Sequence, residues 1–132
     1  MGITKQQYES RLKRIANPIE DDEQIAFVTW CDSELSPPEC RRMYHCPNGG
    51  RRNKAEAAKL KAMGVRKGIP DLFLPIPRQG YHGLYIEMKR IKNGKVSPDQ
   101  QKEIAQLKAD GYAVEVANGS EEAKGKVLRY LA

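Results

Sequence analysis

Five stretches of the chain carry the apolar spacing and end signals of α-helices, and four shorter runs are typical of β-strands. The predicted helices cover residues 4–15, 19–33, 53–64, 97–111 and 120–131. The predicted strands cover residues 42–46, 71–76, 84–89 and 112–117. A mixed sheet with helices on its faces buries the apolar side of every one of these elements, so we predict a single α/β domain.

Polar residues mark the starts of the last three helices. Asn53 and Glu56 stand three positions apart, as in a capping box. Ser97 and Gln100 have the same spacing one helix later, and Ser120 is expected to cap the final helix. We therefore expect each of these helices to begin at or beside the named polar residue.

The strand runs 71–76 and 84–89 are separated by a turn that contains Gly and Pro. If they pair as a hairpin centred near Gln79, Asp71 lies directly opposite Glu87, with Cβ atoms about 4.5–5.5 Å apart. Strand alternation supports this register, because it puts six apolar residues on one face: Leu72, Leu74, Ile76, Leu84, Ile86 and Met88. The other face carries Asp71, Phe73, Tyr85, Glu87 and Lys89.

Two opposed carboxylates repel each other and weaken a sheet unless a cation lies between them. Mg²⁺ or Mn²⁺ suits oxygen ligands, keeps several waters and lowers the pKa of a bound water enough for it to attack a phosphodiester. Lys89 projects from the same face as Glu87, about 6–7 Å along the strand. The alternative is a surface hairpin with an ordinary Glu–Lys pair, which the Pro70-Asp71 pair at hairpin spacing makes less attractive.

The composition is that of a soluble globular domain, with 39% hydrophobic and 30% charged residues. No apolar stretch approaches the roughly 20 residues that cross a bilayer, and the N-terminal MGITKQQYESRLKRIAN lacks the apolar core of a signal peptide. We expect a cytoplasmic protein without a membrane partner. The net charge of +6, from 23 Lys and Arg against 17 Asp and Glu, suits a polyanion such as nucleic acid but does not prove one.

The three cysteines, Cys31, Cys40 and Cys46, are an odd number in a chain that we expect in a reducing compartment, which predicts free thiols. A zinc site from these cysteines and His45 is the alternative. The spacing lacks the C-x2–4-C knuckle, and neighbouring His45 and Cys46 point to opposite faces of a strand. We therefore predict that no zinc is bound.

The runs GVRKGIPDLFLP, GLYIEMKR and SPDQQKEIAQLKADGY, in this order, resemble the VRR-NUC family, a branch of the PD-(D/E)xK nuclease superfamily. The resemblance covers roughly residues 20–131, which leaves residues 1–18 as an N-terminal helical extension of a single domain. It implies a restriction-endonuclease-like mixed sheet flanked by helices. It also implies a metal-dependent nuclease that acts on DNA, in some members on branched DNA, with compact members often encoded by bacteriophages.

The resemblance also implies roles for individual residues. Asp71 and Glu87 match the metal-binding carboxylates, Lys89 matches the catalytic lysine, and the Met88 backbone carbonyl is implied as a further metal ligand. Gln100 matches the glutamine of a Q-x6-L helix whose leucine is Leu107. Gln100 is equally well explained as part of a capping box with Ser97, and both roles are compatible.

Family members place a glutamate on an early helix in an E-x3-Q pattern, which Glu20 and Gln24 fit. Glu23 is a competitor for that metal-binding role, and an acidic helix start is favourable without any metal. The string HCPNGGRRN resembles a further family element, although Asn48 and Gly49 are also an ordinary turn pair. We assign His45 no catalytic role.

Basic residues flank the proposed site in sequence and are expected to grip phosphates on either side of the scissile bond. A solvated helix face is the alternative for some of them. The predicted DNA-binding residues are Arg51, Arg52, Lys54, Arg66, Lys67, Arg90 and Lys92.

Taken with the resemblance, these features predict a metal-dependent DNA endonuclease that prefers branched DNA such as four-way junctions. The alternatives are a non-catalytic nucleic-acid-binding module on the same fold and a nuclease that acts on RNA. Cutting two strands with one active-site set favours a homodimer. The apolar stripe Tyr8, Leu12 and Ile15 is a candidate interface, and packing on the chain's own sheet is the alternative for it.

Overall fold

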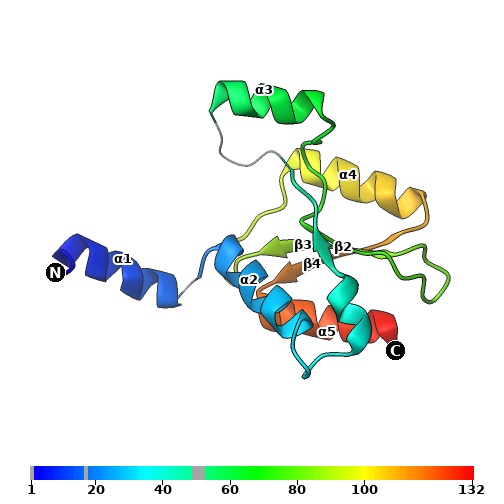
Figure 1. Ribbon diagram of the computed structural model, residues 1–132, viewed down its shortest axis with the longest axis horizontal. Helices are drawn as coiled ribbons and strands as arrows, with labels where there is room; N and C mark the ends of the chain where they lie inside the picture. The colour runs from blue at the N-terminus through cyan, green and yellow to red at the C-terminus, as the bar shows by residue number, and fades with distance from the viewer. Residues whose placement is uncertain (1, 17, 49–52) are drawn as a thin grey trace.

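The computed structural model describes residues 2–16, 18–48 and 53–132, which fold around one four-stranded sheet (Figure 1). The helices are α1 (Lys5–Ala16), α2 (Glu20–Cys31), the 3-10 helix η1 (Pro38–Arg42), α3 (Lys54–Ala62), α4 (Pro98–Ala109) and α5 (Ser120–Leu131). The strands are β1 (Tyr44–His45), β2 (Leu72–Leu74), β3 (Leu84–Lys89) and β4 (Ala113–Asn118).

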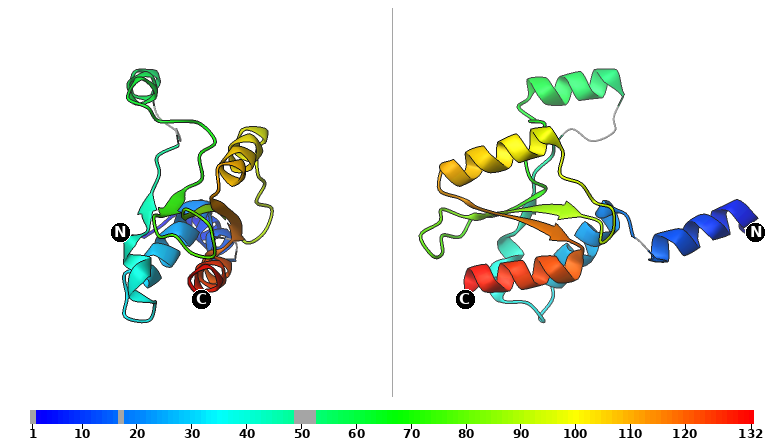
Figure 2. Two further views of the ribbon diagram at one scale, coloured as in Figure 1. Left: turned by 90° about the vertical axis from the view of Figure 1, so that its right-hand side faces the viewer. Right: turned by 180° about the vertical axis from the view of Figure 1, so that it is seen from behind.

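The sheet is mixed and has the strand order β1-β2-β3-β4. β2 pairs antiparallel with both β1 and β3, whereas β4 runs parallel to β3 because α4 forms the crossover between them. α2 and α5 cover one face of the sheet and α4 lies on the other (Figure 2). The predicted α/β class and mixed sheet are therefore confirmed.

The hairpin has the predicted register. Leu72 pairs with Ile86 and Leu74 with Leu84, so the same pairing extended by one residue puts Asp71 opposite Glu87. All six apolar residues of the predicted inner face are buried. Because side chains alternate along a strand, burial of that set turns Glu87 and Lys89 toward α4.

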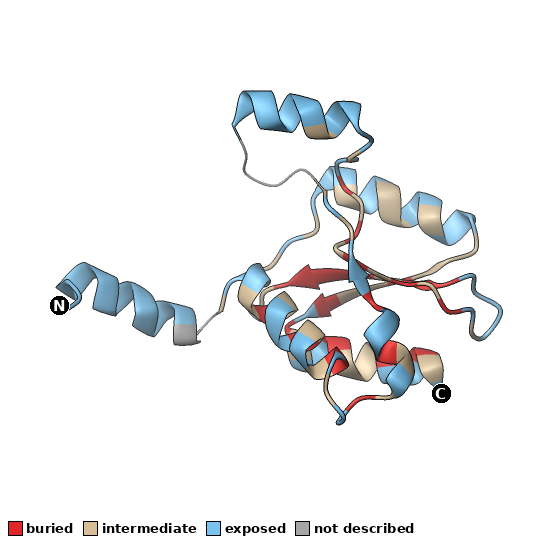
Figure 3. Cartoon of the chain, viewed as in Figure 1, coloured by how far each residue is buried: buried red, intermediate tan, exposed pale blue. Residues whose placement is uncertain are grey.

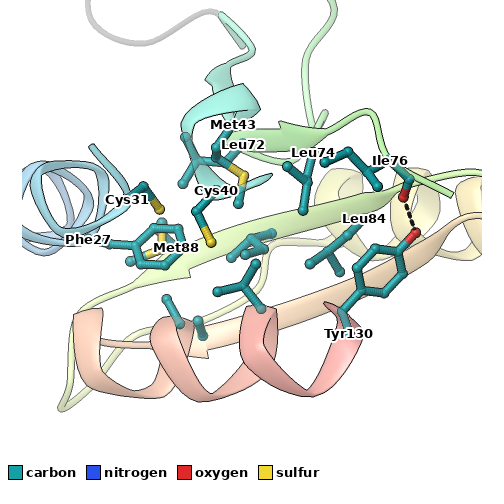
Figure 4. Close-up of a cluster of buried hydrophobic side chains, with 14 residues drawn as sticks. Phe27, Cys31, Cys40, Met43, Leu72, Leu74, Ile76, Leu84, Met88 and Tyr130 are labelled. Atoms are coloured by element: carbon teal, nitrogen blue, oxygen red, sulfur yellow. Dashed lines mark hydrogen bonds between the residues drawn. The ribbon is translucent and has the colours of Figure 1, made fainter. Parts of the chain in front are cut away.

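The core fills the space between the sheet, α2, α5 and η1 (Figure 4). Phe27 and Cys31 from α2 and Cys40 from η1 pack on the inner face of the sheet. Tyr130 closes the core at the end of α5, where its hydroxyl donates a hydrogen bond of 2.6 Å to the carbonyl of Ile76. This buried polar group is thus satisfied without water.

Two strands are shorter than predicted. Arg42 belongs to η1 and not to the first strand, because Pro38 is preset for the first turn of a helix and starts the 3-10 turn. β2 ends at Leu74 because Pro75 has no N–H to donate to the sheet, and Asp71 lies just before the strand.

The prediction that Ser120 caps α5 is wrong. Gly119, with a φ of 98°, is the capping residue and has no side chain to offer. The Ser120 backbone N–H instead donates to the Glu23 carboxylate over 3.1 Å. Glu23 is 6% exposed, so this carboxylate caps α5 from within the fold. The predicted caps Asn53 and Ser97 are confirmed.

α1 and α3 are exposed along their described lengths, apart from the half-buried Leu60 (Figure 3). Tyr8 and Leu12 are 55% and 48% exposed, so packing of this stripe on the chain's own sheet is wrong for these two residues. An Arg14–Asp22 ion pair links α1 to α2. Within the described residues, no helix has the length and apolarity required to cross a membrane.

The Glu23 cap gives a stability test. Glu23→Ala removes the acceptor of the Ser120 N–H, so we expect the free energy of unfolding to fall by about 1–2 kcal/mol. Asp21→Ala, at an exposed carboxylate in the same first turn of α2, is the matched control and should change it by less than about 0.5 kcal/mol. Urea denaturation followed by circular dichroism measures both, and equal effects would contradict the capping role.

Candidate active site

Five polar residues from four parts of the chain converge at the C-terminal end of β3. Asp71 precedes β2, Glu87 and Lys89 lie in β3, Gln100 lies in the first turn of α4, and Glu20 begins α2. The structure therefore brings together the predicted catalytic residues and the predicted helix carboxylate. The hairpin register and the short crossover to α4 produce this convergence.

Lys89 is the centre of the cluster. Its ammonium donates to Gln100 Oε1 over 3.0 Å and lies 3.5 Å from Glu87 Oε1 and 3.7 Å from Glu20 Oε1. The Lys89 side chain is only 5% exposed. A buried ammonium requires partners, and these three oxygens supply them.

Asp71 is held rigidly from two sides. Its Oδ2 accepts a hydrogen bond of 2.8 Å from the Met88 backbone N–H, and its Oδ1 accepts one of 3.1 Å from the Asn48 amide. Strand alternation turns the Met88 carbonyl to the same side as its N–H. The Met88 carbonyl thus faces the side on which Asp71 lies.

Glu87 is a buried carboxylate with only half of its hydrogen-bonding capacity used. Oε1 accepts from the Gln100 amide over 3.0 Å, while Oε2 is buried and has no hydrogen-bond partner among the described residues. Burial, and then the adjacent charge of Asp71, raise the pKa of Glu87 to about 8. Without a bound cation, Glu87 is therefore mostly protonated at neutral pH, because the protein alone does not stabilise its charged form.

A divalent cation fits this arrangement. It would give Glu87 Oε2 the missing partner and remove the repulsion between Glu87 and Asp71, with the Met88 carbonyl as a further oxygen ligand. Among the described residues, no three acidic, His or Cys side chains are close enough to hold an ion by themselves. An ion held here would therefore have Asp71 and Glu87 as its carboxylate ligands, a number that Mg²⁺ accepts when it retains several waters.

Gln100 forms the expected capping box and also contacts the polar cluster. Its Oε1 accepts from the Ser97 N–H over 2.9 Å, and the Ser97 side chain accepts from the Gln100 N–H, which completes a capping box. The same amide group contacts Glu87 and Lys89. The start of α4 and the polar cluster therefore share one side chain.

Comparison with known proteins agrees with this geometry. A family model described as the VRR-NUC domain matches residues 3–121. A solved structure titled "VRR_NUC domain protein" is 32% identical, covers 87% of this chain and 89% of its own, and superposes with a TM-score of 0.72. No curated protein matches.

The chain belongs to the VRR-NUC domain family. This membership places it in a nuclease family. It also agrees with the mixed sheet flanked by helices that the sequence predicts.

The structure separates the two candidate helix carboxylates of this VRR-NUC domain. Glu20 points to Lys89, whereas Glu23 is occupied at the start of α5. Gln24, the partner of Glu20 in the E-x3-Q pattern, lies 3.1 Å from the His45 ring. The sequence could not decide which of Glu20 and Glu23 belongs to the site, because both stand in the first turn of the same helix.

Asn48 is a site residue that the sequence analysis missed. Its amide donates to Asp71 Oδ1 and to the Ile69 carbonyl, both over 3.1 Å, and so fixes the turn that presents Asp71. His45 supports the same turn with a ring nitrogen 2.9 Å from the Asp71 carbonyl. Both residues line a cavity of about 350 Å³ beside Asp71. The HCPNGGRRN resemblance was the available signal, but an ordinary turn explained it equally well.

The predicted DNA-binding residues are spread around the site. Arg90 directly follows Lys89 in the chain, and Lys67 pairs with Asp99 over 3.0 Å beside Gln100. Lys92 is exposed in the following turn. The other described members, Lys54 and Arg66, are exposed at the two ends of the α3 segment. Arg51 and Arg52 lie outside the described residues.

Cys31 and Cys40 are separate from this cluster, whereas Cys46 lies beside Asp71, to whose carbonyl its backbone N–H donates over 2.7 Å. Cys31 and Cys40 are buried in the core, where burial raises the pKa of Cys31 to about 12 and also raises that of Cys40. Cys46 is partly buried, and burial raises its thiol pKa as well. The absence of zinc stays a prediction.

The raised pKa of Glu87 predicts how stability depends on pH. The folded state holds a proton that the unfolded state releases above about pH 4.5, so the stability due to protonated Glu87 is lost as pH rises to about 8. In EDTA, the free energy of unfolding should fall over this window by up to about 1.4 kcal/mol per pH unit. Added Mn²⁺ should stabilise the protein more at pH 8 than at pH 5.5.

Urea denaturation at several pH values measures this slope. Glu87→Gln cannot titrate and should flatten it, whereas Glu34→Gln, at an exposed carboxylate, should retain it. A wild-type slope in Glu87→Gln would show that another group carries the pH dependence.

Proposed function

We propose that this VRR-NUC domain is a metal-dependent DNA endonuclease with its catalytic centre at Asp71, Glu87 and Lys89. The observation that carries the proposal is Glu87 Oε2, which is buried beside the fixed Asp71 carboxylate and has no hydrogen-bond partner in the part of the chain that the structure describes. A fold that needed Glu87 only for stability would leave neither oxygen unsatisfied, because each such group costs about 1–3 kcal/mol. A bound cation accounts for it.

Asp71, Glu87 and the Met88 carbonyl would hold Mg²⁺ or Mn²⁺, with Glu20 at the rim of the cluster. When bound, the metal lowers the pKa of a water and offsets charge on the scissile phosphate. Lys89 stands between Glu87 and Glu20, where its ammonium orients the attacking water or stabilises the pentavalent transition state. Gln100 fixes the positions of Lys89 and Glu87 relative to each other.

A non-catalytic nucleic-acid-binding module is the rival function. Phosphate binding alone favours cationic surfaces, and burying Glu87 next to Asp71 opposes it. The catalytic proposal explains these carboxylates, whereas the binding module does not. RNA as substrate is a second alternative, which a cleavage panel tests directly.

Substitutions in the cluster test the catalytic proposal. Asp71→Ala, Glu87→Gln and Lys89→Ala should each lower cleavage at least about a hundredfold, since each removes a group that acts on the transition state. In EDTA above about pH 8, where Glu87 is ionised, Glu87→Gln should also be at least as stable as the wild type, because it removes the repulsion with Asp71. Near-normal turnover by folded Asp71→Ala would refute the assignment.

The assay uses labelled duplex, flap, four-way-junction and RNA substrates with Mg²⁺ or Mn²⁺, and EDTA as the metal-free control. We expect cleavage of DNA, preferentially of branched DNA, and none in EDTA. Lys102→Gln, at an exposed position of α4 outside the cluster, is the matched surface control. Equal cleavage in EDTA would exclude a metal-dependent mechanism.

We further propose a homodimer whose interface includes α1. The chain has one Asp71–Glu87–Lys89 set, and two-fold symmetry would supply a second for the opposite DNA strand. Tyr8 and Leu12 lie one helical turn apart on α1 and are both exposed. A contiguous apolar stripe of this kind suits a contact with an equivalent helix.

Light scattering after size exclusion tests the dimer. At micromolar concentration the wild type should have twice the chain mass of 14.9 kDa, and Tyr8→Glu with Leu12→Glu should shift it to the single-chain value. Met63→Glu, at a 72% exposed apolar residue on the segment that ends α3, is the matched control. If the wild type is a monomer with full activity on a four-way junction, one chain cuts the two strands in sequence and the dimer proposal is wrong.

A further inference from the structure

A second cavity lies at the opposite end of the sheet from the candidate active site. It has a volume of about 470 Å³ and is lined by residues of α4, α5, β4 and the turn between β2 and β3. β4 is an edge strand, and α4 and α5 flank it on either side (Figure 2). The cavity therefore opens beside a sheet edge and uses none of the residues placed in the active site.

The charge of this cavity favours an anion. Lys108 from α4 and Lys126 and Arg129 from α5 line it, against Glu115 from β4. Glu115 is paired with Lys126 over 3.1 Å, which offsets both charges. Lys108 and Arg129 therefore give the opening its net positive charge, and the two come from different helices. A phosphate between them would meet a cation on each side.

The same cavity has aromatic walls. Tyr81 is 44% exposed at one side, and Tyr112 lines another. The Tyr112 ring is held in place by edge contacts with Tyr85, Phe73 and His82 at centroid distances of 5.3, 5.9 and 5.5 Å. A fixed aromatic ring beside cations is the combination that binds a nucleotide, because bases stack on rings while phosphates contact Lys and Arg.

The cavity is also preformed. Gln79, at the tip of the turn, has the uncommon φ of 54° for a residue with a side chain. Its amide donates to the carbonyls of Arg129 and Tyr130 over 2.8 and 2.9 Å, which ties the turn to the end of α5. The carbonyls are those that the helix end leaves without an internal partner. A ligand would therefore meet walls that are already in position.

We propose that this cavity is a second nucleotide-binding site, which takes a base and its phosphate from an unpaired DNA strand. The choice of DNA as the source rests on the proposed function, whereas the nucleotide chemistry of the cavity does not. Leu84 in the cavity and Lys89 in the active site are five residues apart on one strand, about 17 Å. This span equals about five base steps of duplex DNA.

The placement gives the cavity a function in substrate choice. A duplex engaged at Lys89 would reach the cavity only where one of its strands leaves the stack, because a stacked base cannot contact Tyr81. Flaps and junctions provide such strands, and an intact duplex does not. The cavity thus favours branched over continuous DNA by binding the departing strand.

Fluorescence anisotropy of labelled dT6 in EDTA tests binding without any cleavage. Tyr81→Ala should weaken binding about tenfold. Lys108→Gln and Arg129→Gln should each weaken it and reduce the salt dependence, by about 0.7 in the log–log slope per lost contact. Tyr81→Phe keeps the ring and should bind as the wild type does, and Lys102→Gln is the charge-matched control on α4.

Photo-crosslinking of a 5-iodouracil hexanucleotide, followed by peptide mass spectrometry, should label Tyr81 or Tyr112. Free dTMP, tested as a competitor, should bind more weakly than dT6. If dTMP binds as tightly as dT6, the ligand of the cavity is a free nucleotide and not a DNA strand, and that part of the proposal is wrong. Unchanged dT6 binding in the Tyr81, Lys108 and Arg129 variants would show that the cavity is not the binding site. If the wild type cleaves DNA but the three variants bind dT6 normally, the cavity proposal fails and the nuclease proposal stands. If the variants lose dT6 binding but the wild type cleaves no DNA, only the nuclease proposal fails.

Discussion

The contact between the Glu87 and Asp71 carboxylates governs how the rest of this domain is arranged. Two like charges at the end of a buried strand are unfavourable, and burial raises the pKa of Glu87 to about 8. Every neighbouring polar group reduces that cost: Lys89 by its charge, Gln100 by its amide, and the Met88 N–H by fixing Asp71. One Glu87 oxygen remains without a hydrogen-bond partner among the described residues, and the proposed cation would supply one.

The sequence predicted those features around this contact that depend on residues close together in the chain, namely the hairpin register and two helix caps. Alternation has a period of two, so the apolar face of the hairpin also determined that Asp71 and Glu87 oppose each other. Helix capping by Asn53 and Ser97 was also predictable, because each cap contacts a residue only three positions further along the chain.

The features that sequence could not determine depend on contacts between distant segments. Glu23 caps a helix that begins 97 residues later, which no local pattern encodes. That contact and the ion pair between Glu20 and Lys89 together distinguish Glu23 from Glu20. Asn48 donates a hydrogen bond to Asp71, 23 positions away in the chain. From sequence, Asn48 and Gly49 looked like an ordinary turn pair. The exposure of α1 was equally hidden, because an apolar stripe suits the chain's own core as well as another chain.

The hydrogen bond from Asn48 to the Ile69 carbonyl, 21 positions apart, joins the two ends of the segment that contains α3. That segment leaves the sheet and returns to it at one point, and α3 has no buried residue (Figure 1). Loop-closure entropy rises only slowly with length, so the excursion is free to grow, shrink or exchange its helix while the pinned ends keep the strands in register. The surface chemistry of α3 can therefore be changed with little effect on the strands that position the candidate active site.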